Sequence, residues 1–211
     1  MSARRIAVLV VLAMAVAIAI VATIPPSGPR SIRHFDPDRM AALETDMWQA
    51  YYLHQNIRLF RGLLTLLHEQ YRYSWAKAAT AGFHFARAAA TFSGARSDYE
   101  RVLPDIERGY AIARDWTGAT FDPARVARAE LAWWVARRVP GQDDAPHVGE
   151  LIAEENALLF DAPAERVLRA STARAQAGRL RDDTASHPDW SVIQGLLTES
   201  YRELHAVVNE P

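Results

Sequence analysis

The sequence contains no cysteine, and this absence removes several classes of chemistry at once. Disulfide bonds, thiolate metal sites and cysteine nucleophiles all need that residue. A chain without disulfides must be held together by its apolar core, and 211 residues of which 50% are apolar can form a core of substantial size. We therefore expect one domain that is stabilised by packing.

A large excess of basic charge is also missing. The formal net charge is -1, whereas domains that bind nucleic acid usually carry a marked positive excess. Nearly all the basic residues are arginine, which we interpret as a bias toward GC-rich codons and not as a recognition surface. The sequence therefore predicts no nucleic-acid partner.

Catalytic motifs are absent as well. No serine stands in a G-x-S-x-G context, there is no glycine-rich phosphate loop, and His68-Glu69 lacks the second histidine of the zinc-protease motif H-E-x-x-H. No histidine follows a glutamate at the Glu-x-x-His spacing of helical di-iron sites. The sequence favours a non-enzymatic protein, predicts no cofactor or metal, and assigns no catalytic residue.

The N-terminus carries the most specific signal. After "MSARR" come nineteen uncharged residues, Ile6 to Ile24, which as a helix would extend roughly 29 Å, close to the thickness of a bilayer core. We predict a transmembrane signal-anchor within residues 1–24, with a cleaved signal peptide as the alternative because Ala17-Ile18-Ala19 has small-x-small spacing. Arg4 and Arg5 favour a cytoplasmic start, so the body is expected on the periplasmic, extracytoplasmic side of the cytoplasmic membrane.

After a linker over residues 25–35, the remaining chain, 36–211, has the pattern of helices throughout. Asp36-Pro37 and Asp122-Pro123 each combine an N-cap acceptor with proline at the first helical position. The first helix changes its apolar face near Gln55-Asn56, which indicates either a break or a change of packing partner. The expected helices cover 37–72, 75–92, 98–116, 123–160 with an interruption near Gly141, 163–182 and 188–208. The fold class is therefore predicted as all-α, with the transmembrane helix followed by a six- to seven-helix bundle.

A repeated motif opens the two halves of this bundle. The stretch "FDPDRMAALETDMW" at 35–48 recurs as "FDPARVARAELAWW" at 121–134. We interpret the recurrence as a duplicated three-helix unit, with pseudo-repeats over 36–117 and 122–208.

Each copy of the motif places a glutamate within an apolar helical stripe: Glu44 in the first and Glu130 in the second. Glu155 has a similar position in a later helix. A buried carboxylate needs a partner, yet Arg39 and Arg125 lie too far around their own helices to pair with the glutamate of the same copy. We predict crossed structural ion pairs about a local two-fold, Arg39 with Glu130 and Arg125 with Glu44.

The aromatic residues include more adjacent pairs than one-sided stripes can bury, so some should form an interface. The candidates are Tyr51, Tyr52, Trp133, Trp134 and Trp190. The leading prediction is a non-enzymatic, membrane-anchored accessory or scaffolding subunit of an extracytoplasmic or membrane-associated complex, with a protein partner. Two alternatives stay open: a metal- or haem-binding bundle or oxidoreductase that uses the buried carboxylates and His54, and a protein that binds a small apolar ligand.

Overall fold

The chain is all-α in the computed structural model, which describes residues 3–210 apart from the side chains of six residues in the first helix. This described part has nine α-helices, one short 3-10 helix and no strands. The α-helices are α1 (Ala3–Thr23), α2 (Pro37–Tyr52), α3 (Asn56–Tyr71), α4 (Trp75–Gly94), α5 (Leu103–Thr117), α6 (Pro123–Ala136), α7 (Ala145–Phe160), α8 (Ala164–Asp183) and α9 (Trp190–Asn209), and the 3-10 helix η1 (Tyr99–Val102) precedes α5.

Side-chain caps begin several of these helices as the sequence predicts. Asp36 accepts hydrogen bonds from the backbone N–H groups of Asp38 and Arg39 at the start of α2, and Asp122 accepts one from Ala124 at the start of α6. Each cap satisfies donors that have no partner inside the first turn, and the following proline already has a helical φ. The two copies of the Asp-Pro motif are therefore confirmed as helix starts.

The number of helices differs from the prediction. The body, residues 37–209, contains eight α-helices where six to seven were expected, because both long predicted helices are broken. The first ends at Tyr52 and restarts at Asn56, with His54 in a left-handed conformation between them (φ 55°). The second ends at Ala136 and restarts only at Ala145. Each half thus contains four α-helices and not three. The origin of the two halves by duplication stays a prediction.

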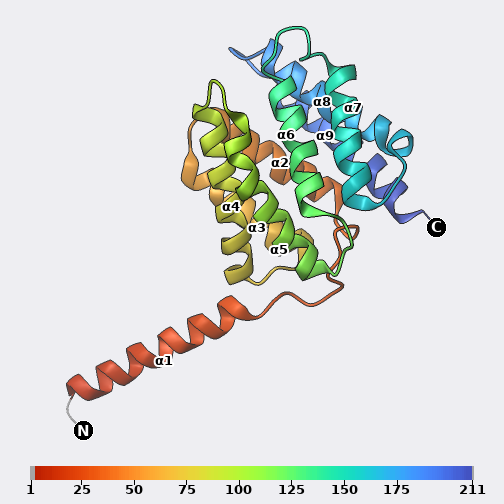
Figure 1. The fold of residues 1–211 in the computed structure, drawn as a ribbon. Coiled ribbons are helices and arrows are strands. Elements are labelled where there is room, and N and C mark those ends of the chain that lie inside the picture. Colours follow the sequence, from red (N-terminus) through yellow and green to blue (C-terminus); the bar gives the residue numbers. More distant parts are fainter. Residues whose placement is uncertain (1–2, 211) are drawn as a thin grey trace.

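The eight helices of the body close into a ring. Each helix from α2 to α9 packs against its neighbours in sequence, and α9 returns to pack against α2. Figure 1 shows α3, α4 and α5 as one group and α6 to α9 as another, with α2 between them. The largest apolar cluster takes residues from both groups, among them Leu67 of α3, Val126 of α6 and Leu204 of α9. The two halves therefore share one core.

Helix α1 lies apart from this ring. Figure 1 shows it projecting away from the body, and among the helices of the body it packs only against α4 to an appreciable extent. Within the described residues, no helix combines the length and the hydropathy needed to cross a bilayer. The transmembrane helix predicted for residues 1–24 is therefore not confirmed, and part of that prediction falls on residues 1 and 2, outside the described range.

Candidate functional site

The interior of the ring contains a network of polar side chains, and its first part is centred on Glu44 of α2. Arg174 of α8 donates through Nη2 to Glu44 Oε1 at 2.5 Å, and the Tyr201 hydroxyl of α9 donates to Glu44 Oε2 at 2.5 Å. Glu44 is only 5% exposed. Burial alone would lower the pKa of Arg174, but Glu44, Tyr201 and Glu155 together more than offset this effect, so the pKa is raised and the guanidinium stays charged.

The second part of the network surrounds Glu155 of α7. Its Oε1 accepts a hydrogen bond from the Tyr110 hydroxyl of α5 at 2.8 Å, and its Oε2 accepts one from Trp133 Nε1 of α6 at 2.6 Å. Arg174 joins the two parts, because its guanidinium carbon lies 4.9 Å from the centroid of the Trp133 ring. Burial raises the pKa of Glu155, while Arg174 and the two hydrogen-bond donors act in the opposite direction.

Glu130 of α6 is the incomplete member of the network. Its Oε2 is enclosed and has no hydrogen-bond partner. Burial, reinforced by the charge of Glu155, raises the pKa of Glu130 to about 8, although Tyr110 and Arg174 act in the opposite direction. Glu130 is therefore a neutral carboxylic acid at pH 7, and this neutral state avoids placing an unpaired charge in the interior.

The predicted crossed ion pairs are wrong. Arg39 lies at the surface and donates from Nε to Glu69 Oε2 at 2.8 Å, and the partner of Glu44 is Arg174. Arg125 is exposed at the edge of a surface groove and forms no ion pair in the described part of the chain. Position in the apolar stripe correctly identified the interior glutamates. The arginine partners were predicted from the same motif, whereas the actual partner of Glu44 comes from another helix, α8.

Sequence reasoning missed Arg174, Tyr110 and Tyr201. Helix α8 has a low mean hydropathy and the weakest segregation of apolar residues among the body helices, so its buried face is hard to identify from residue spacing. The local sequence gives no usable signal either: Ala-Arg-Ala occurs at 86–88, 127–129 and 173–175, but Arg87 and Arg128 are exposed and only Arg174 enters the interior.

The predicted interface aromatics mostly take part in packing within the body. Trp133 is 8% exposed and belongs to the interior, which makes it unavailable as an interface residue. Tyr51 and Tyr52 are half-buried and meet edge to face, with ring centroids 5.1 Å apart. Trp134 packs edge to face against Phe92, and Trp190 packs at the border of an apolar cluster.

The alternative of a metal-ion site finds no set of ligands among the described residues. His54 is exposed in the turn between α2 and α3, so it does not share the interior with Glu44. Among the residues that the structure describes, no group of three or more histidine, aspartate or glutamate side chains is placed to hold a metal ion. The interior carboxyls are instead held by arginine, tyrosine and tryptophan.

A second polar cluster joins α4 and α5. Asp105 accepts hydrogen bonds from Arg87 Nε at 2.5 Å and interacts with His84 Nδ1 at 2.9 Å. Arg87 and His84 together hold the pKa of Asp105 below its usual value against the effect of burial. An acid and a histidine in contact are two parts of a hydrolytic triad, but the described structure records no hydroxyl in hydrogen-bond contact with His84.

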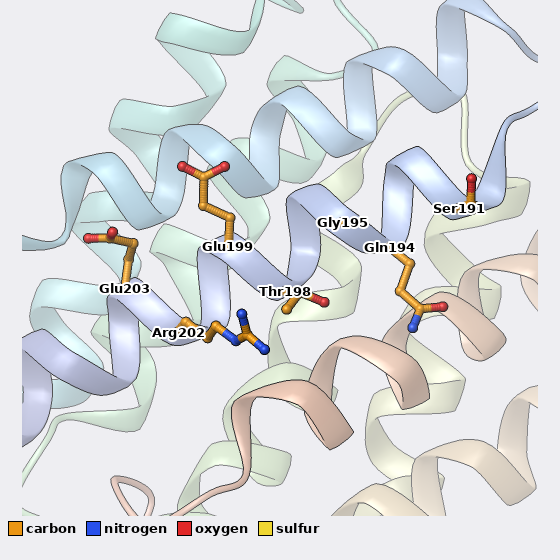
Figure 2. Close-up of a pocket in the computed structure, with 7 residues that line it drawn as sticks. All are labelled: Ser191, Gln194, Gly195, Thr198, Glu199, Arg202 and Glu203. Atoms are coloured by element: carbon orange, nitrogen blue, oxygen red, sulfur yellow. The ribbon is translucent and has the colours of Figure 1, made fainter.

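The surface hollows also lack convergent chemistry. One groove is formed by a single helix, α9, and Figure 2 shows Glu199 and Glu203 on its α8 side while Gln194 and Arg202 lie on the other. Arg169 of α8 pairs with Glu203, and Asp38 of α2 pairs with Arg202. The other groove lies between the linker, the loop between α5 and α6, and the end of α7. None of the interior network residues lines either groove.

The interior network connects six helices of the ring, α2 and α5 to α9, through contacts between side chains that are largely shielded from solvent. It can hold a proton on Glu130, but it does not open to either of the two grooves described above.

A scan against protein-family models finds no matching family, and searches of curated proteins and of solved structures find no similar chain. Function must therefore be argued from the geometry alone.

Proposed function

We propose that the chain is a non-enzymatic accessory or scaffolding protein, attached to the cytoplasmic membrane by residues 1–24, whose helical body lies on the extracytoplasmic side and binds a protein partner. The observation that carries the proposal is the contrast between α1 and the body. The polar groups of the interior bind one another, whereas the described large apolar side chains of α1 remain at least half exposed.

The exposed side chains of α1 support membrane attachment. The described large apolar residues of this helix are each at least half exposed, and no α1 residue whose side chain is described belongs to an apolar cluster of the body. They are Val8, Val10, Val11, Leu12, Met14, Val16, Ile20 and Val21. A contiguous apolar surface of this kind is costly in water and marks a contact with a membrane or a protein.

The interior supports a structural role for the body. Glu44 and Glu155 are hydrogen-bonded by side chains from four other helices, which fixes the positions of those helices relative to one another. Groups that hold each other so closely are not free to bind a substrate, and a rigid helical body is suited to presenting a surface to a partner.

Membrane attachment is tested by fractionation. Full-length protein should sediment with membranes, resist an alkaline carbonate wash and enter solution only with detergent. Replacing Leu12→Arg and Val16→Arg should move it to the soluble fraction, because each charge is expensive within an apolar layer. The matched control, Leu12→Ala and Val16→Ala, keeps the helix uncharged and should stay with the membrane.

The two readings of the N-terminus give different masses. A retained anchor leaves a protein of 23.6 kDa, whereas a cleaved signal peptide leaves a shorter chain that is released by osmotic shock. Release of the full-length protein by osmotic shock or by carbonate alone would refute membrane attachment.

The partner is tested by gentle detergent extraction from native membranes, followed by measurement of the protein mass of the eluted particle. The proposal expects a particle that contains a second protein in fixed ratio, and chemical cross-links from the body of this chain to that protein. Recovery of this chain alone, at more than one detergent concentration, would contradict the scaffolding role.

A further inference from the structure

We propose that the end of the body next to α1 binds anionic phospholipid headgroups through Arg30, Arg72 and Lys77, with Trp75 and Trp116 at the level of the interface. This inference rests on the proposed attachment of α1 to the membrane and adds a second, charge-dependent contact. The patch consists of these five residues, contributed by the linker, the C-cap of α3, the start of α4 and the end of α5.

The linker brings the three cations together at the point where α1 leaves the body. Arg30 lies over the ring of Trp116 at 4.1 Å from its centroid, and Lys77 Nζ lies 5.9 Å from the same centroid. Arg72 lies against the linker at Gly28, where a Cβ atom would be only 3.3 Å from Arg72 Nε. Gly28 also has a φ of 121°, which favours glycine. Figure 1 shows α1 leaving near this end of α4.

These cations carry charge that the described protein does not neutralise. Arg72 donates to the backbone oxygen of Glu69, and neither it nor Arg30 nor Lys77 forms an ion pair among the described side chains. The carboxylates nearest in sequence are already occupied: Glu69 pairs with Arg39, Asp115 pairs with Arg114, and Asp36, the nearest to Arg30, caps the start of α2. Eleven of the other eighteen arginines of the body have an aspartate or glutamate partner, and what distinguishes this end is that three cations without such a partner lie where the apolar helix α1 leaves the body.

The two tryptophans have the exposure expected at a membrane interface. Trp75 is 40% exposed and stacks on His68, with ring centroids 3.9 Å apart. Trp116 is half-buried and donates from Nε1 to the backbone oxygen of Tyr71 at 3.1 Å. Tryptophan is enriched where an apolar layer meets water, because its ring is apolar and its N–H can still bond.

The location of the patch next to α1 favours a lipid headgroup over another anion as its ligand. Thr23 ends α1 and Arg30 follows seven residues later, so the patch lies within at most about 24 Å of the apolar helix along the chain. Juxtamembrane basic residues are attracted by the negative surface potential of anionic leaflets, and each contributes roughly a fivefold gain in binding when it lies near the surface. Three such residues together predict about a hundredfold preference for an anionic over a neutral surface, lost as ionic strength rises.

The test uses the absence of native cysteine. In the full-length chain, Ala76→Cys places one label site on the exposed start of α4, and Gln176→Cys places a comparison site on the exposed face of α8. Each protein, labelled with an environment-sensitive fluorophore, is added to phosphatidylcholine vesicles with or without a fraction of phosphatidylglycerol. The label at 76 should become protected from an aqueous quencher only with the anionic lipid, and the label at 176 should stay accessible in both.

Two matched variants distinguish the charge of the patch from the net charge of the whole protein. Replacing Arg30→Gln, Arg72→Gln and Lys77→Gln should abolish the protection at 76, whereas replacing Arg166→Gln, Arg169→Gln and Arg202→Gln removes the same charge elsewhere and should leave it intact. Circular dichroism would establish that both variants remain folded. Equal loss of protection in the two variants would overturn the assignment of the patch.

The outcomes also separate this inference from the proposed function. Sedimentation with both vesicle types, with the label at 76 accessible throughout, would overturn the patch and leave membrane attachment standing. Failure to sediment with either vesicle would remove the attachment on which the patch depends. If soluble glycerophosphate alone protected the label at 76 to the same extent, the patch would be a site for a free phosphate ester, and the lipid assignment would be wrong.

Discussion

Glu44 and Glu130 occupy the same position in two copies of one motif, yet their surroundings are opposite. Glu44 has an arginine and a tyrosine as donors, whereas Glu130 has an enclosed oxygen without a partner and a pKa raised to about 8, chiefly by burial. The motif therefore fixes where the carboxyl lies but not its charge. That charge depends on which donors the other helices supply.

The arginines that correspond between the halves make the asymmetry clearer. Arg174 lies 87 residues after Arg87, and Glu130 lies 86 residues after Glu44. Arg174 crosses from the second half to Glu44 in the first, but Arg87 does not make the reciprocal contact with Glu130. It lies at the surface and pairs with Asp105, with more than half of its side chain exposed. Only one of the two possible crossed pairs is formed.

The largest effect should follow from breaking that one pair. Replacing Glu44→Gln leaves Arg174 charged, largely buried with 21% of its side chain exposed, and without its partner, so the free energy of unfolding should fall by about 3 kcal/mol. The measurement is urea unfolding followed by circular dichroism, in the same mild detergent for all variants. Glu69→Gln, which removes a partner from the exposed Arg39, is the control and should change stability by less than about 1 kcal/mol. Equal losses would show that Arg174 is not desolvated.

The next effect is the pH dependence that Glu130 gives to stability. Below the ordinary carboxyl value of 4.5 Glu130 is protonated in both states; between 4.5 and about 8 only the folded state keeps the proton. The unfolded chain then binds fewer protons, so stability should fall as pH rises through this window, by up to about 1.4 kcal/mol per pH unit. The raised pKa of Glu155 acts in the same direction.

The variant Glu130→Gln isolates this contribution. Glutamine cannot ionise, so its stability should lie close to that of the unaltered protein near pH 5 and exceed it by a few kcal/mol near pH 8. Unfolding free energies of both proteins across pH 5 to 8 give the comparison. Two parallel curves would mean that Glu130 is ionised in the fold, and that an unseen donor satisfies its oxygen.

The sequence could predict the glutamates but not this difference between them. Apolar spacing placed Glu44 and Glu130 on interior faces, because a helical period converts residue separation into direction. It could not identify Arg174 or Tyr201, which come from α8 and α9, because no local pattern states which helix will pack against which. The same limit explains the crossed pairs drawn from Arg39 and Arg125.

The overall fold was predictable to a similar depth. Asp-Pro caps are local chemistry, so the starts of α2 and α6 followed from the sequence. The break at His54 could be suspected from the change of apolar face, but a break and a change of packing partner give the same pattern. Closing the ring requires contact between α2 and α9, which are separated by most of the body. No local sequence pattern predicts that contact between α2 and α9.

A smaller effect should follow from breaking the surface pair of Arg87 and Asp105, which forms in place of a crossed pair between Arg87 and Glu130. Replacing Asp105→Asn weakens the contacts with Arg87 and His84, but Arg87 can turn to solvent, so the loss in unfolding free energy should be about 1 to 2 kcal/mol. A loss as large as that of Glu44→Gln would contradict the distinction between the surface pair and the interior pair.

The smallest effect is expected at the arginine that the motif itself carries. Arg39 and its partner Glu69 are both exposed by more than a third, so solvent screens the pair and the ordering of two long side chains costs much of what the contact provides. Arg39→Ala should therefore lower the unfolding free energy by less than about 1 kcal/mol, and that change should shrink further in high salt. Arg174→Ala is the contrasting variant, because it leaves Glu44 without its cation in the interior and should cost several times more at any ionic strength. Only desolvation makes the pair between Arg174 and Glu44 costly to break. A salt-insensitive loss at Arg39 equal to that at Arg174 would therefore remove the physical difference between the arginine repeated in the motif and the partner that the fold supplies.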